Sequence, residues 1–184
     1  MKATEQLMAE HEGILLMLRV LDKLSGQIES GRKVDSKELE KILEFLRVFA
    51  DKCHHGKEED VLFPAMEKAG MPRDGGPIAV MLAEHNQGRA FIRGLAEAIG
   101  EYGQGDAKAG AGVVENGRGY IALLTQHINK ENNILFPMAD RLLGEKKQDE
   151  LAEEFERIEV ERIGLGKHEE FHGLLERLET AHLG

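Results

Sequence analysis

Two stretches of the chain carry a histidine, a glutamate four residues later, and then the tripeptide Leu-Phe-Pro. The first pair is His54 with Glu58, and the second is His127 with Glu131. Residues four apart lie on the same face of a helix, about one turn from each other. Each stretch therefore directs an imidazole and a carboxylate at one point, which is the geometry of a metal site.

The repeat extends beyond these two stretches. The tripeptide Ala-Glu-His occurs once before each of them and supplies His11 and His85. His11 precedes His54 by 43 positions, and His85 precedes His127 by 42. An internal repeat of this length indicates two related helical hairpins, each with one histidine on its first helix and His-x-x-x-Glu on its second.

A neighbouring pair, His55 and Glu59, has the same spacing as His54 and Glu58. Only the His54 pair aligns with the second stretch when the Leu-Phe-Pro segments are superposed. The repeat therefore predicts His54 as the ligand and excludes His55. Cys53, on the other side of His54, should point about 100° away from it and act as a small core residue.

Helices must position these side chains. Hydrophobic residues at helical spacing predict four long helices, over residues 4–30, 35–69, 77–102 and 106–144. A proline lies inside the second and the fourth helix, where it should bend the last turns. Residues 145–184 carry no copy of the repeat and predict two shorter helices that pack on the bundle. We expect an all-α fold, an up-down-up-down four-helix bundle over residues 1–144 with additional C-terminal helices.

Short connections make consecutive helices antiparallel, so residues at equal distances from a turn lie at the same level. His11 and His54 differ by one residue in their distance from the turn near residue 32, which is about 1.5 Å along a helix. Counting residues from the turns near residues 72 and 105 in the same way places His85 and His127 at the level of His11 and His54. The repeat thus predicts one layer of six ligands: His11, His54, Glu58, His85, His127 and Glu131.

A single core histidine is more often a hydrogen-bonded structural residue than a metal ligand. Six buried polar groups at one level, however, would each be costly without a cation between them. The set is unlike a structural zinc site, which closes with four ligands, and unlike the oxygen-rich sites of calcium and magnesium. It suits two non-haem iron ions bridged by the carboxylates and a solvent oxygen, with two imidazoles for each ion.

Composition excludes several other classes of protein. A net charge of −10 over 184 residues argues against a nucleic-acid partner. The longest wholly apolar run, Ile78 to Ala83, is far shorter than the roughly 20 residues that a membrane span requires. The single Cys53 has no partner within the chain, and no apolar leader opens the sequence, so we expect a cytoplasmic protein.

These motifs together resemble the hemerythrin-like, HHE cation-binding domain over roughly residues 1–144. They include Glu-His-Asn-Gln-Gly-Arg at residues 84–89 and His-x-x-x-Glu-Asn-Asn-Ile-Leu-Phe-Pro at residues 127–137. The resemblance implies an up-down four-helix bundle with a di-iron centre. It places the ligand roles on the six residues named above, with Glu58 and Glu131 as bridges.

One position departs from the oxygen-carrying members of that family. They have a fifth histidine one turn along the third helix, where this chain has Arg89. The pattern is closer to the four-histidine centres of bacterial iron-centre repair proteins and related sensors. It predicts an exchangeable position on both ions unless His168 or His172 supplies a replacement ligand. Tyr120, two turns before His127, is a candidate hydrogen-bond donor to a bound ligand or simply a core aromatic residue.

The leading hypothesis is a di-iron protein that binds or reduces O2, NO or peroxide as a sensor, a scavenger or a redox protein. Iron storage, iron delivery or iron-centre repair is the alternative within the metal-binding class. A metal-free helical interaction module, in which the repeat reflects only ancestry, is the alternative from another class.

Overall fold

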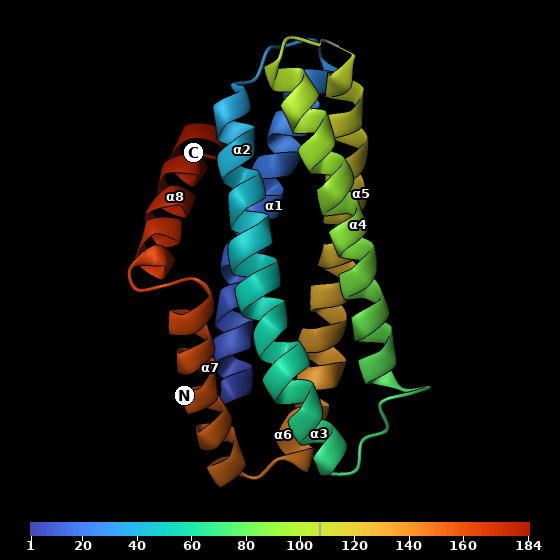
Figure 1. Cartoon of the computed structure of the whole chain (residues 1–184), viewed down its shortest axis with the longest axis vertical. Helices are drawn as coiled ribbons and strands as arrows, with labels where there is room; N and C mark the ends of the chain where they lie inside the picture. The colour runs from blue at the N-terminus through green and yellow to red at the C-terminus, as the bar shows by residue number, and fades with distance from the viewer. Residues whose placement is uncertain (107) are drawn as a thin grey trace.

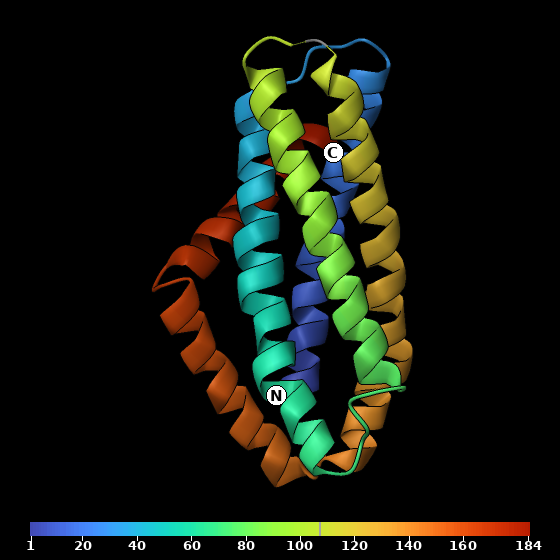
Figure 2. The ribbon, with the colours of Figure 1, turned by 45° about the vertical axis from the view of Figure 1, so that its right-hand side comes forward.

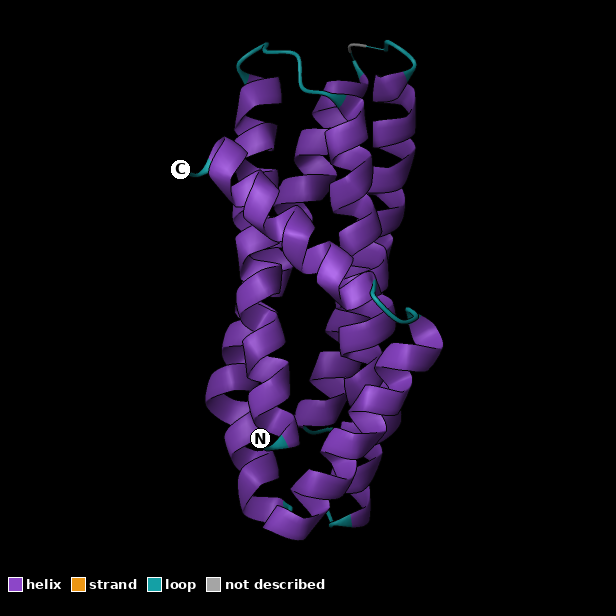
Figure 3. Cartoon of the chain, turned by 90° about the vertical axis from the view of Figure 1, so that its left-hand side faces the viewer, coloured by secondary structure: helices purple, strands orange, loops and turns teal. Residues whose placement is uncertain are grey.

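A computed structural model describes residues 1–106 and 108–184. Its four long helical segments run antiparallel to one another (Figure 1), and their apolar side chains at helical spacing pack together. The first hairpin, residues 3–68, contains α1 (Ala3–Glu29), α2 (Ser36–Phe45), η1 (Leu46–His55), η2 (Glu58–Leu62) and α3 (Phe63–Lys68). The second hairpin, residues 77–142, contains α4 (Pro77–Gly103), α5 (Ala109–Lys130), η3 (Glu131–Leu135) and α6 (Phe136–Leu142). Within the described residues there are only helices, turns and loops (Figure 3). The predicted all-α four-helix bundle is confirmed.

The segments η1, η2 and η3 are π-helical, which the helical spacing of the apolar residues does not predict. In a π-helix each N–H donates to the carbonyl five residues earlier. The Phe63 N–H donates to the Glu58 carbonyl, and the Phe136 N–H donates to the Glu131 carbonyl. A proline, which has no N–H to donate, follows each phenylalanine. We expected a bend of the helix at each proline. The structure has a wider, π-helical turn there, which begins at the glutamate of each repeat.

The core consists of two clusters of apolar side chains, one on each side of the predicted ligand layer. Leu7 belongs to one cluster and Ile14 to the other, and His11 lies between them on the same face of α1. Phe63 and Phe136 belong to the first of these clusters. The ligand layer is thus closed by apolar side chains along the bundle axis.

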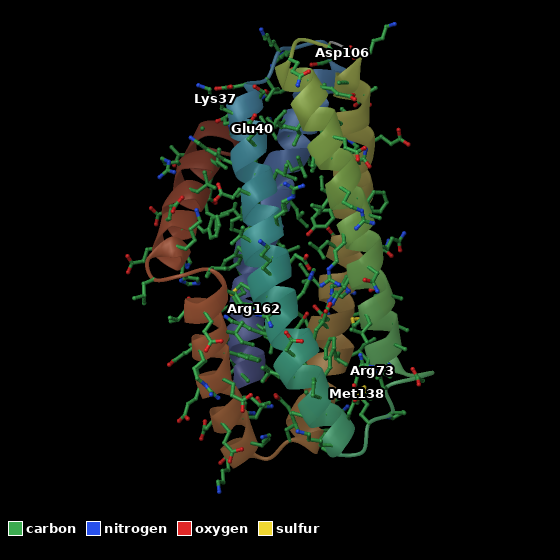
Figure 4. All side chains as sticks on the ribbon, in the orientation of Figure 1. Lys37, Glu40, Arg73, Asp106, Met138 and Arg162 are labelled. Carbon is green, nitrogen blue, oxygen red and sulfur yellow. The ribbon has the colours of Figure 1, made fainter. Side chains whose placement is uncertain are left out.

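The C-terminal extension forms α7 (Glu145–Arg162) and α8 (Lys167–His182). Both helices lie on the side of the bundle formed by α1 and α2, away from α4 and α5 (Figure 2). Arg162, labelled in Figure 4, donates to the Lys52 carbonyl at 3.3 Å and forms an ion pair with Asp60. Phe171 of α8 packs edge-on against Phe45, with ring centroids 5.4 Å apart. The extension therefore packs mainly on the first hairpin, and Gln148 at the start of α7 donates to Asp140 of α6 at 3.1 Å.

Among the helices that the structure describes, none combines the length and the apolar composition needed to cross a lipid bilayer.

Candidate metal centre

The structure brings together the six side chains that the repeat predicts. Each is at most 1% exposed: His11, His54, Glu58, His85, His127 and Glu131. The histidines meet in pairs through their Nε2 atoms. This distance is 3.0 Å between His11 and His54 and 3.1 Å between His85 and His127. Each hairpin thus contributes one pair of imidazoles to a shared, buried layer.

Each carboxylate faces one histidine from each hairpin. One oxygen of Glu58 lies 3.7 Å from His54 Nε2, and the other lies 3.3 Å from His85 Nε2. The Glu131 carboxylate has the mirrored arrangement, 3.2 and 3.1 Å from one imidazole of each hairpin. Among the described residues, none donates a hydrogen bond to these four buried oxygens. Buried carboxylates without donors require a cation nearby.

The other ring nitrogen of each histidine, Nδ1, contacts an oxygen on the outside of the layer. The partners, at 2.7–2.8 Å, are Glu10 for His54, Glu84 for His127, Glu59 for His85 and Asn132 for His11. An Nδ1–H that donates to such an oxygen leaves Nε2 unprotonated in the neutral ring. This pattern fixes the tautomer and orientation of histidines that ligate metals.

The paired Nε2 atoms therefore direct lone pairs at each other, and a cation or a proton must separate them. Two nitrogens at about 2.1 Å from one ion and at a right angle lie about 3 Å apart, which matches both pairs. Burial lowers the pKa of His85, but the neighbouring Glu58 and Glu59 carboxylates outweigh it and raise that pKa to about 9. The layer thus attracts positive charge, and its donors fit nitrogen- and oxygen-ligated metal ions.

The ligand atoms form two groups, and within each group all the atoms lie within 4.8 Å of one another. The first group is the one expected for a single ion, and it contains His11, His54, Glu58 and Glu131. The second contains His85 and His127 with Glu58, and it also contains His55. The alignment of the two repeats excludes His55 as a ligand, whereas the structure buries it in this layer. Its ring stacks on His85, with centroids 3.9 Å apart and planes 16° apart.

His55 is held from outside in the same way as the other histidines. Its Nδ1 lies 3.3 Å from a carboxylate oxygen of Asp51. Arg89 donates from Nε to Asp51 at 2.9 Å and from a terminal nitrogen to Glu59 at 2.8 Å. Burial, followed by the charge of His85, lowers the pKa of His55 well below its ordinary value. Arg89 therefore does not enter the layer but supports two carboxylates that orient imidazoles.

Two lysines complete the outer contacts. Lys57 donates to Glu10, which is the carboxylate that holds His54, and Lys130 donates to Glu84 in the same way. Burial raises the pKa of Glu10, but His54 and Lys57 outweigh it and lower that pKa from 4.5 to about 2. Glu10 is thus an anion that holds the His54 ring. A glutamate directly before the first histidine and a lysine three residues after the second occur in both copies of the repeat, so the alignment could have identified them.

Other candidates lie outside the layer. His168 and His172 of α8 line a cavity of about 360 Å³ beside Glu10 and Lys57, and their rings contact each other rather than the six ligands. Tyr120 is 1% exposed and belongs to the apolar core. Cys53 is a buried free thiol, and burial raises its pKa to about 12.

Comparison with known proteins agrees with this geometry. Residues 2–139 match the family model for the hemerythrin HHE cation-binding domain. The iron-sulfur cluster repair protein YtfE of Yersinia pseudotuberculosis is 30% identical over 131 residues, which are 70% of this chain and 57% of that protein. An uncharacterised protein of Mycobacterium tuberculosis is 24% identical over 162 residues, which are 88% of this chain and 63% of that protein. The chain thus spans about three fifths of the length of these relatives.

Proposed function

Since the chain belongs to the hemerythrin HHE cation-binding domain family, we propose that its ligand layer holds two non-haem iron ions. His11 and His54 would hold one ion, here called the α1–η1 position. His85 and His127 would hold the other, the α4–α5 position. Glu58 and Glu131 would serve both ions, because each faces one histidine of either position. A cytoplasmic location is part of the same proposal.

Iron held by imidazoles and carboxylates changes its oxidation state readily and binds small molecules at coordination positions that the protein leaves free. We therefore propose that the protein binds or reduces O2, NO or peroxide. The observation that carries the proposal is the set of four buried carboxylate oxygens without donors, facing four imidazole nitrogens.

The residues around the layer orient the imidazoles and exclude bulk water. Phe136 stacks on His11 with ring centroids 5.5 Å apart, and Phe63 stacks on His85 at 6.1 Å. These apolar rings close the layer on one side, and the ligands themselves are almost fully buried. Such a site favours very small ligands over organic substrates.

Metal analysis after anaerobic reconstitution with Fe(II) tests the metal site. We expect about two iron ions per chain, and the variant His182→Ala serves as control because His182 contacts Glu38, far from the layer. Less than about 0.3 iron per chain would contradict the proposal and favour the metal-free interaction module.

Stopped-flow mixing of the reduced protein with O2, NO and peroxide tests the function. No spectral change with any of them would reject this role while leaving the metal site intact.

Iron-centre repair is the second candidate, because relatives at 30% identity carry the name of an iron-sulfur cluster repair protein. Such a role requires that iron leave the layer, although its ligands are at most 1% exposed. Incubation of the iron-loaded protein with an apo iron-sulfur protein separates the two roles. Transfer within minutes would support repair, and retention of iron over hours would support a resident centre.

A further inference from the structure

The two proposed metal positions are not equivalent, because the ligand atoms of His55 group with those of only one of them. A ligand atom of His55 is within 4.8 Å of those of Glu58, His85 and His127. Its ring centroid is 5.7 Å from that of His127 and 3.9 Å from that of His85. The ring is 3% exposed, so it belongs to the buried layer rather than to the surface.

The outer contacts of His55 match those of the predicted ligands. A carboxylate, Asp51, lies at its Nδ1, as Glu59 lies at that of His85 and Glu84 at that of His127. Asp51 thus occupies Nδ1 of His55 from outside the layer, and Nε2 is the ring nitrogen left to face a metal ion. A carboxylate at Nδ1 keeps the proton of the neutral ring on that nitrogen and leaves Nε2 unprotonated and able to ligate a metal ion.

Three residues build this arrangement: His55 and Asp51 of the first hairpin and Arg89 of the second. The counterparts of His55, Asp51 and Arg89 are Ile128, Leu124 and Leu15. All three counterparts are apolar and belong to the bundle core or pack against it. The polar unit of imidazole, carboxylate and guanidinium is thus formed once in the molecule's described part, and the positions that the repeat relates to it supply only packing.

We propose that His55 is a third imidazole ligand of the α4–α5 position. The α1–η1 position then has one protein ligand fewer and is where an exogenous small anion binds. This inference rests on the proposed di-iron site and replaces the expectation of one exchangeable position on each ion. The fifth histidine that Arg89 displaces from the third helix is thereby supplied by the second helix.

Proton NMR of the reduced, iron-loaded protein in water tests the ligand count without any substitution. Each ligating imidazole carries an exchangeable Nδ1 proton, and the paramagnetic iron shifts it far outside the usual range. We expect five such resonances. Four resonances in a protein that holds two irons would overturn the inference, whereas a protein without iron would show none and would instead contradict the proposed function.

Azide titration of the oxidised protein tests the consequence. We expect one azide per pair of irons in the unmodified protein and two in His55→Ala, with return to one when free imidazole fills the vacated space. The matched control is Ile128→Ala, which removes the counterpart side chain in the second hairpin and should bind one azide. A single azide in His55→Ala, with no response to imidazole, would overturn the inference.

Discussion

The two hairpins share one ligand skeleton but differ in what surrounds it. In both, a glutamate before the first histidine holds the second histidine and pairs with a lysine. In the first hairpin that lysine, Lys57, is 2% exposed and also contacts Glu159 of α7. In the second hairpin Lys130 is 34% exposed. The repeat therefore sets the symmetry of the ligands, while the C-terminal extension and a few substitutions make the two halves unequal.

Removal of a carboxylate that both halves share should have the largest effect. Glu58→Gln and Glu131→Gln should each reduce iron to less than about one tenth of the unmodified level, since each carboxylate faces both positions. Without iron, the same variants should also lose stability, because removal of either carboxylate leaves the protonated imidazoles that face it without a counter-charge. Iron analysis and urea unfolding of the metal-free protein measure these effects. Iron retained above about half of the unmodified level in either variant would contradict the role of these carboxylates as shared ligands.

Substitution of neighbouring histidines should have the next largest effect and should separate the two metal positions. His54→Ala removes half of the imidazoles of the α1–η1 position, so iron should fall to about one ion per chain. His55→Ala should retain about two, because His85 and His127 still hold the second ion. Equal iron losses in the two variants would contradict this difference and make His55 as necessary for iron binding as His54.

The outer glutamates offer a matched pair for stability. Glu10→Gln leaves Lys57 buried with Glu159 as its remaining partner and should cost about 2–3 kcal/mol of unfolding free energy. Glu84→Gln leaves Lys130 free to reach water and should cost less than about 1 kcal/mol. Urea unfolding of the metal-free proteins gives both values. Adding Lys57→Met to Glu10→Gln should recover most of the loss, and failure to do so would assign it to the His54 contact instead.

Asn132→Asp should give the smallest effect and makes the halves more alike. Asn132 holds His11 where the counterpart Glu59 holds His85. A carboxylate partner makes an imidazole a stronger donor, so iron binding should tighten by less than about tenfold and the reduction potential should fall. Spectroelectrochemical titration measures the potential, and a potential that rises would contradict the orienting role of this position.

Different parts of the molecule were predictable to different degrees. The bundle and its ligand layer followed from periodicity, short turns and the repeat, because antiparallel helices of known rise set the level of every residue. Glu10 and Lys57 were missed although both repeat, since an exposed ion pair and a histidine partner have the same sequence pattern. The packing of α7 and α8 on the first hairpin was not predictable, because an apolar stripe does not say which neighbour it covers.

The sequence alone predicted which four histidines and two glutamates share one layer, because their spacing on helices does not depend on distant contacts, and the structure then paired the histidines. Only the tertiary structure decided the place of His55. Neighbouring residues of an α-helix point about 100° apart. If this segment were α-helical and His54 pointed into the layer, His55 would therefore point away from it. The π-helical segment η1 changes that angle, and the contacts with Asp51 and His85 hold both rings in one layer.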